Sequence, residues 1–226
     1  MKKMVSIPFM LMGIFFVVCL IVSNILEAKI IQLGPVTATA GMLVFPISYI
    51  INDCISEVWG YKKARLVIWS GFAMNFIVVG IAQIAVFLPA APFWDGGDSF
   101  NFVFGMTPRI VFASLCAFLV GSFLNAYVMS KMKIMSKGRN FSLRAIVSTL
   151  AGESADSIIF FPIAFGGLIP NEALLIMVGT QALLKSVYEI IVLPVTIRVV
   201  KYVKKIDGSD VYDADVSFNP FKIGEL

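Results

Sequence analysis

The stretch "PFMLMGIFFVVCLIVSNIL", residues 8–26, decides the fold. It carries no charged side chain, and as a helix it can cross ~30 Å of hydrocarbon, which takes about 20 residues. Similar apolar runs recur along the chain and are typical of transmembrane helices. The composition agrees, because 59% of the 226 residues are hydrophobic, only 14% are charged and the mean hydropathy is +0.91. The sequence therefore predicts an all-α integral membrane protein.

The apolar runs along the chain predict six transmembrane helices. Their approximate bounds are 5–26, 41–59, 66–88, 108–130, 145–168 and 173–200. The longer connections are Glu27–Ala40 and Pro89–Thr107, and the second, rich in Pro and Gly, is expected to be exposed or partly re-entrant. No small-residue cleavage site follows the first run, so we expect that helix to stay in the mature protein.

Lysine and arginine predict the orientation. With six spans, four basic clusters fall on one side of the membrane, which the positive-inside rule makes cytoplasmic, together with both termini. This topology accounts for the net charge of +4 and leaves no indication of nucleic-acid binding. We expect a transmembrane domain over 1–206 and a polar, loose cytoplasmic tail over 207–226. The clusters are Lys2 and Lys3; Lys62, Lys63 and Arg65; Lys131, Lys133, Lys137, Arg139 and Arg144; and Arg198, Lys201, Lys204 and Lys205.

Several kinds of chemistry have no support in the sequence. There is no histidine, and Cys19, Cys54 and Cys116 are odd in number and lie in apolar runs, which predicts neither a disulfide framework nor a metal site. No phosphate-binding P-loop, nucleophile elbow or zinc-protease motif occurs. We therefore expect no enzyme, cofactor or metal.

Acidic residues inside the apolar runs carry the functional signal. In "AGESADSIIFFPIAF", Glu153 and Asp156 point one way on a helix near the bilayer midplane, where an ionised carboxylate is costly unless it is paired or protonated. The last span offers Gln181, Lys185 and Glu189 at spacing four, and a tight turn predicts that the two helices are antiparallel neighbours. This cluster is either a closed structural ion network or a binding site, and intramembrane charges usually mark a ligand path.

The second and other spans add further polar residues. Asp53 and Glu57 share a face of the second span, nearer the cytoplasmic end, where water should reach them more easily. Glu57 is equally expected to pair with the basic loop that follows it. Asn24 lies toward the outer mouth, and Arg109 opens the fourth span. Most serines and asparagines in such helices only hold neighbouring helices together.

Facing carboxylates suit a small solute that presents several N–H donors. The N1–H and 2-amino group of a guanine, for example, match a carboxylate bidentately. Aromatic walls for a flat ring are available from Phe160, Phe161, Phe165 and Tyr188. A short echo between "GSFLN" (residues 121–125) and "GESAD" (residues 152–156) does not by itself establish an inverted repeat.

Four segments together resemble the bacterial queuosine-precursor transporter family. They are "SNILEAKI" (residues 23–30), "FPISYIINDCISEVWGYKKARLVIWSGF" (45–72), "RIVFASLCAFLVGSFLNAYVMSKMK" (109–133) and "STLAGESADSIIFFPIAF" (148–165). The resemblance implies a six-helix inner-membrane importer of 7-deazaguanine bases, similar in fold to the substrate-binding subunits of energy-coupling-factor vitamin importers. It implies substrate-binding roles for Asn24, Asp53, Glu57, Arg109, Glu153, Asp156, Lys185 and Glu189.

The chain departs from the family pattern in its fourth span. Ser122 and Asn125 stand where many relatives carry Gln and Asp, which puts a ligand role for this span in doubt.

Several functions stay open at this point. One is a self-sufficient carrier, proton-coupled or facilitative, for 7-cyano- or 7-aminomethyl-7-deazaguanine. The alternative is a binding subunit that needs a separate ATPase and coupling protein, but the first span lacks the small-residue stripe used for tight docking, which favours the carrier. The free base queuine is also compatible, and the excess of acids favours tolerance of a cationic substituent. The sequence does not decide between a homo-oligomer and a monomer.

Overall fold

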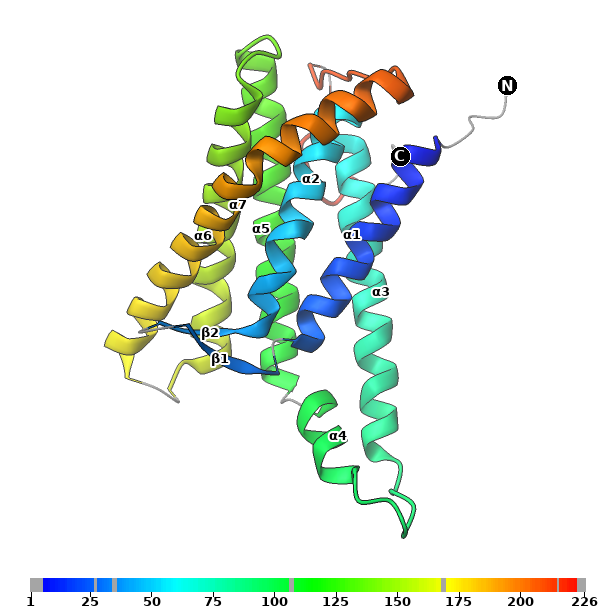
Figure 1. Cartoon of the computed structure of the whole chain (residues 1–226), viewed down its shortest axis with the longest axis vertical. Coiled ribbons are helices and arrows are strands. Elements are labelled where there is room, and N and C mark those ends of the chain that lie inside the picture. The colour runs from blue at the N-terminus through cyan, green and yellow to red at the C-terminus, as the bar shows by residue number, and fades with distance from the viewer. Residues whose placement is uncertain are drawn as a thin grey trace.

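A computed structural model describes residues 6–222 except 27, 34–35, 106–107, 168–169 and 215. These residues form seven α-helices and one two-stranded hairpin (Figure 1). The elements are α1 (Ile7–Leu26), β1 (Ile30–Leu33), β2 (Val36–Thr39), a 3₁₀ turn (Ala40–Leu43), α2 (Phe45–Trp59), α3 (Tyr61–Phe87), α4 (Gly97–Phe104), α5 (Pro108–Met135), α6 (Phe141–Phe165) and α7 (Asn171–Asp207).

Five segments of the described chain are long and apolar enough to cross a membrane. The first three are α1, the stretch Ala40–Trp59 (which includes α2) and α3. The other two are the part of α5 from Phe112 and the whole of α6. The prediction of an all-α membrane protein is therefore confirmed. The sixth predicted span, 173–200, falls within α7, a helix of 37 residues that is not among these five, and six spans stay a prediction.

Helix α2 lies at the centre of the bundle. It contacts α1, α3, α5, α6 and α7, and all its residues except Ile47 are buried. The expectation that water reaches Asp53 and Glu57 easily is therefore wrong, because their exposed fractions are 0% and 2%. Neighbouring helices close over both side chains, so a helix rich in polar residues becomes the core of the fold.

Two glycines let α5 and α6 approach closely. A Cβ atom built on Gly152 would lie 2.8 Å from the Gly121 carbonyl oxygen and 2.7 Å from the Tyr49 ring. A Cβ atom on Gly121 would lie 2.9 Å from the Gly152 carbonyl oxygen. The repeated glycines of "GSFLN" and "GESAD" thus mark the point where the two helices meet.

The connections differ from the predicted loops. Gly60, with φ of +80°, separates α2 from α3, so α3 begins earlier than the predicted residue 66. The connection 89–107 contains the short helix α4, which contacts α3, and the connection 27–40 contains the hairpin.

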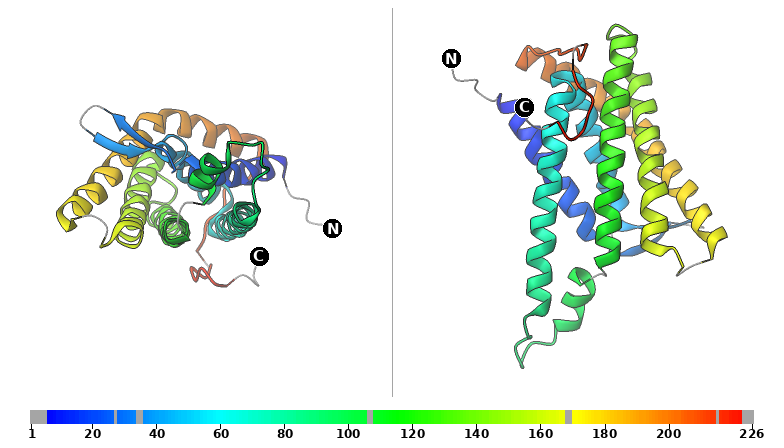
Figure 2. Two further views of the ribbon diagram at one scale, coloured as in Figure 1. Left: turned by 90° about the horizontal axis from the view of Figure 1, so that it is seen from below. Right: turned by 180° about the vertical axis from the view of Figure 1, so that it is seen from behind.

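The helix bundle has two ends, at which different helix termini and connections gather. Figures 1 and 2 place the starts of α1 and α3, the α5–α6 connection and the end of α7 at one end, which we call the basic end. The hairpin, α4 and the last residues of α6 lie toward the other. Lys2 and Lys3 lie outside the described residues.

The C-terminal segment packs against the basic end, so the expectation of a loose tail is wrong. Asp213 accepts the Tyr61 backbone N–H at 2.9 Å, and Arg65 donates to the carbonyls of Ser217 (3.2 Å) and Asn219 (2.7 Å). Arg65 is fully buried, and the tail supplies acceptors that a buried guanidinium requires. The division of the chain at residue 206 stays a prediction.

Candidate functional site

Glu153, Asp156 and Lys185 form a buried ion cluster, which we call the lysine cluster. The two acids lie one turn apart on α6, and α7 packs beside that helix. Lys185 Nζ lies 3.1 Å from Glu153 Oε2 and 3.0 Å from Asp156 Oδ2. The predicted antiparallel pairing and the predicted contact between lysine and acids are both confirmed.

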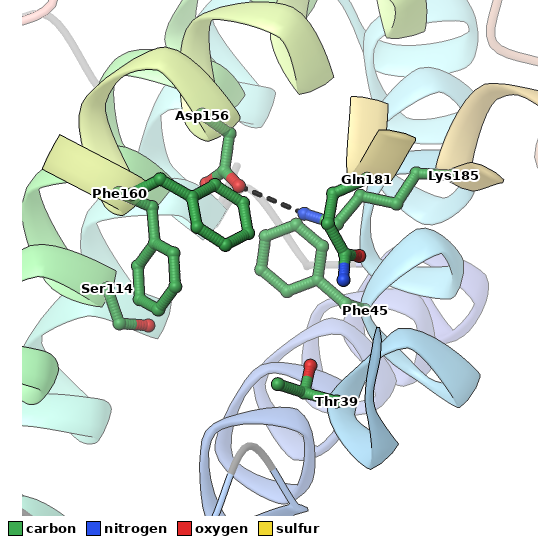
Figure 3. Close-up of a pocket in the computed structure, with 8 residues that line it drawn as sticks. Thr39, Phe45, Ser114, Asp156, Phe160, Gln181 and Lys185 are labelled. Atoms are coloured by element: carbon green, nitrogen blue, oxygen red, sulfur yellow. Dashed lines mark hydrogen bonds and ion pairs between the residues drawn. The ribbon is translucent and has the colours of Figure 1, made fainter. Parts of the chain in front are cut away.

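A small cavity adjoins this cluster, with Asp156 and Lys185 on its wall (Figure 3). Its volume of about 30 Å³ is enough for a water molecule or two. Sites for organic ligands usually measure about 300–1,000 Å³, so this one has to widen to admit a solute. The other lining residues are Thr39, Phe45, Ser114, Phe160, Phe161 and Gln181.

Glu153 is fully buried, and among the described residues its Oε1 atom has no hydrogen-bond partner, while Oε2 lies 3.1 Å from Lys185 Nζ. Lys185 balances part of its charge through the ion pair at 3.1 Å. A buried acceptor without donors costs about 1–3 kcal/mol or more. The lysine cluster therefore has capacity for N–H donors brought by a ligand.

Aromatic rings surround the polar wall. Figure 3 shows the ring of Phe45 next to Lys185, whose Nζ lies 4.0 Å from the ring centroid. Phe160 and Phe161 line the cavity as predicted, and Phe165 packs against both of them instead of lining it. Tyr188 packs against the hydrophobic core. Sequence reasoning missed Phe45, because only the crossing of α2 over α7 brings it to the cavity.

Asn24 and Arg109 lie at or beyond the edge of this site. Asn24 accepts a hydrogen bond from Ser114, which lines the cavity. Arg109 donates through Nη2 to the Gly166 carbonyl at 2.6 Å and through Nε to the Ile163 carbonyl. It therefore caps the end of α6 and does not join the lysine cluster.

Glu57 belongs to a separate ion network at the basic end, which we call the Glu57 network. It pairs with Arg144 of α6, with Lys204 of α7 at 2.6 Å and with Lys133 of α5 at 3.8 Å. Asp210 of the tail bridges the two lysines at 2.7 and 2.8 Å. The expected pairing with the loop after α2 does not occur, since three other helices supply the cations.

Two further predicted acids are Asp53 on α2 and Glu189 on α7. Asp53 accepts a hydrogen bond from Ser148 Oγ at 3.2 Å. Both acids are buried. The described residues hold no ion pair from either acid to a lysine or arginine.

In the fourth predicted span, Ser122 and Asn125, which depart from the family pattern, take part in contacts between helices. Asn52 donates to the Ser122 carbonyl at 3.1 Å and to Asn125 Oδ1 at 2.7 Å, and Asn125 reaches Thr149 of α6 at 3.4 Å. These bonds tie α2, α5 and α6 together. In the part of the chain that the structure describes, no three acidic, cysteine or histidine side chains gather in a way that could hold a metal ion.

Comparison with known proteins identifies the family to which the chain belongs. The family described as "Putative vitamin uptake transporter" matches residues 39–199, so the chain belongs to this family of membrane transporters. As a member of a transporter family it is not an enzyme.

Its curated relatives bear more specific names. The chain is 28% identical over 181 residues to the "Probable queuosine precursor transporter" of Bacillus subtilis (strain 168), covering 80% of this chain and 78% of that protein. It is 25% identical over 154 residues to the "Queuosine precursor transporter" of Escherichia coli (strain K12), covering 68% and 67%. The resemblance to queuosine-precursor transporters is confirmed. No solved structure matches.

Proposed function

We propose that this protein imports a queuosine precursor, a 7-deazaguanine base, across the bacterial inner membrane. The observation that carries the proposal is the lysine cluster beside an aromatic-walled cavity in a chain related to proteins named for this activity. In the proposed arrangement six spans, α7 included, cross the membrane and the basic end is cytoplasmic. A fold similar to the substrate-binding subunits of energy-coupling-factor importers is part of the same proposal.

The chemistry of the cluster supports a guanine-like edge. A carboxylate accepts two parallel N–H donors, and the N1–H and 2-amino group of the base present such a pair. Glu153 offers Oε1, which has no donor among the described residues, and Asp156 lines the cavity. Lys185 neutralises the acids while the site is empty, and substrate binding displaces its ammonium from Asp156.

The aromatic rings supply the flat walls that a base requires. Phe45 from α2 and Phe160 from α6 line the cavity together with the ion pair of Asp156 and Lys185 (Figure 3). Movement of these rings would widen the cavity from its present volume. Both the 7-cyano and the 7-aminomethyl precursor suit this arrangement, and the aminomethyl cation would pair with the second acid.

The proposal is tested by measuring whether expression of the protein restores queuosine in the tRNA of a deficient strain. A bacterium that lacks precursor synthesis and its own importer would express the wild type, Glu153→Gln, Asp156→Asn or, as a control, Glu172→Gln at an exposed position. Each strain would receive nanomolar 7-cyano- or 7-aminomethyl-7-deazaguanine, or queuine. We expect rescue by the wild type and by the control but not by well-expressed cluster variants.

Other outcomes have definite meanings. Rescue by all four proteins would establish transport and return the acids to a structural role. No rescue by any protein, despite good membrane expression, would contradict a self-sufficient importer. Rescue that appears only when an ATPase coupling module is supplied would support the binding-subunit alternative.

A further inference from the structure

A second, larger cavity lies between α3, α5 and the C-terminal tail, and we call it the α3–α5 groove. Its volume is about 500 Å³, and the residues that line it are mostly aromatic or aliphatic. Val120, Tyr127 and Phe221 line it and are themselves exposed, so it opens on the outside of the bundle. Because α3 and most of α5 are long and apolar enough to cross a membrane, the α3–α5 groove faces lipid.

The tail forms one wall of the α3–α5 groove and is held there by hydrogen bonds. Tyr61 Oη donates to the Phe218 carbonyl at 3.0 Å, and Trp69 Nε1 donates to the Pro220 carbonyl at 2.8 Å. The Phe221 ring packs on Trp69, with the two ring centroids 5.9 Å apart. Figure 2 shows the tail passing between α3 and α5 at the basic end. The shape of the groove is therefore fixed by specific contacts.

Along α5 the lining changes from apolar to polar toward the basic end. It extends from Cys116 to Tyr127, about 16 Å along the helix axis, which is close to half of the ~30 Å hydrocarbon core. Tyrosine is enriched at the membrane interface, and Lys131 follows Tyr127 by one turn. A phospholipid presents its acyl chain, ester region and charged headgroup in the same order.

Lys131 lies at the headgroup end of the α3–α5 groove. Its Nζ lies 4.2 Å from the ring centroid of Phe218 and 5.8 Å from that of Tyr127, and both rings line the groove. Among the described residues, no carboxylate lies within ion-pair distance of this ammonium. Lys133, two residues further on, is by contrast engaged by the Glu57 network. An ammonium without an acidic partner at the end of an apolar groove favours an anionic headgroup.

We propose that the α3–α5 groove binds one anionic phospholipid, with an acyl chain along the rings of Trp69 and Phe123 and the headgroup phosphate paired with Lys131. A headgroup that also carries an ammonium would bring a positive charge to the basic end, where Lys137 and Arg139 are exposed and repel it. The inference depends on the chain lying in a membrane and is independent of the substrate that it imports.

Native mass spectrometry of the purified full-length protein tests the proposal, with phosphatidylglycerol and phosphatidylcholine of identical acyl chains as the added lipids. We expect the first phosphatidylglycerol to bind about fivefold more tightly than phosphatidylcholine, the effect of one favourable charge contact. Lys131→Gln should remove that difference without weakening phosphatidylcholine binding. Lys63→Gln is the matched control and should keep the difference, since Lys63 lies 5.3 Å from the ring centroid of Phe9 in a neighbouring groove between α1 and α3.

Three outcomes would contradict the proposal. Equal affinity of the wild type for the two lipids would overturn the choice of an anionic headgroup. An equal loss in Lys63→Gln and Lys131→Gln would show that the charge contact does not belong to the α3–α5 groove. A wild type that binds neither lipid and is a dimer would overturn the lipid site in favour of a second copy of the chain over the groove.

Fluorescence quenching locates the lipid without changing a lysine. Phospholipids with brominated acyl chains quench the tryptophans that they contact, and Trp69 lines the α3–α5 groove. We expect brominated phosphatidylglycerol to quench the wild type more strongly than brominated phosphatidylcholine does, and we expect no such difference in Trp69→Phe. A difference that persists in a folded Trp69→Phe variant would mean that the anionic lipid binds elsewhere.

Discussion

At the scale of single residues, the interior of this protein is held by contacts that tolerate little change in size or charge. Gly121 and Gly152 leave no room for a methyl group at the crossing of α5 and α6. Lys185 is the one described cation within ion-pair distance of both Glu153 and Asp156. Both features lie within the same turn of α6, so packing and charge balance of the site depend on each other.

We expect Gly152→Ala to lower thermal stability, because its methyl group would press on the Gly121 backbone and the Tyr49 ring. Overpacking of this kind costs about 1–3 kcal/mol. Gly179→Ala is the matched control, since a Cβ atom there meets nothing within 4 Å and alanine favours the helix. Thermal unfolding in detergent measures both, and equal midpoints would contradict the close crossing.

We expect Lys185→Met to destabilise the protein more than Glu153→Gln, because it leaves two buried acids without their cation. Removing one partner of a buried pair costs about 3–5 kcal/mol. The double variant Glu153→Gln, Lys185→Met should recover part of that loss, as one buried charge is then absent. Unfolding midpoints of the three variants check this, and strictly additive losses would show that the contacts seen here contribute little.

At the scale of elements, the tail acts as a strap across the basic end. It joins the start of α3, through Tyr61 and Arg65, to α5 and α7 through Asp210. Burial works to raise the pKa of Asp210, but hydrogen bonds from Lys133 and Lys204 outweigh it and hold the pKa below its usual value. A carboxyl group whose pKa is lower in the folded state stabilises the fold above its unfolded pKa, and loses that effect as the pH falls through the folded pKa.

We therefore expect Asp210→Asn to lower the unfolding temperature at pH 7 and to have progressively less effect below about pH 4, the unfolded value of an aspartate. Asp95→Asn, the same change at an exposed position in the connection before α4, should change little at either pH. Unfolding temperatures of the wild type and both variants across this range test the strap. A difference between wild type and Asp210→Asn that is the same at both pH values would contradict it.

At the scale of the whole molecule, the two ends of the bundle differ. The Glu57 network joins α2, α5, α6 and α7 at the basic end, whereas the cavity is lined by Thr39 of the hairpin and lies toward the opposite end. A carrier exposes its site to one side at a time, and a network of buried ion pairs suits the closed side. We therefore expect the basic end to be the closed side in this arrangement.

We expect Glu57→Gln to loosen that end, since three cations would lose the acid between them. Labelling of the buried Cys54 by a maleimide, followed by peptide mass spectrometry, should be faster in this variant than in the wild type. Lys205→Gln, an exposed change on the same end of α7, should leave the rate unaltered. An unchanged rate in Glu57→Gln would contradict closure by the network.

The sequence by itself determined the class of protein, most of its helices and the acids that lie within them. Apolar runs of membrane-spanning length, and carboxylates within them, are local properties of the chain, so residues 8–26 and 151–165 were sufficient to identify them. The helix bounds were less predictable, because turns of helix outside the apolar runs, such as Tyr61–Arg65, carry no hydrophobic signal.

Only the tertiary structure decided which polar residues meet. Periodicity places Asp53 and Glu57 on one face of α2, but their partners come from other helices. Asp53 accepts a hydrogen bond from Ser148 of α6, whereas Glu57, one turn further on, pairs with three cations. Such partners depend on how helices distant in sequence cross. A sequence pattern therefore fixes the face of a side chain, whereas packing alone fixes its neighbours and hence its ion pairs and hydrogen bonds.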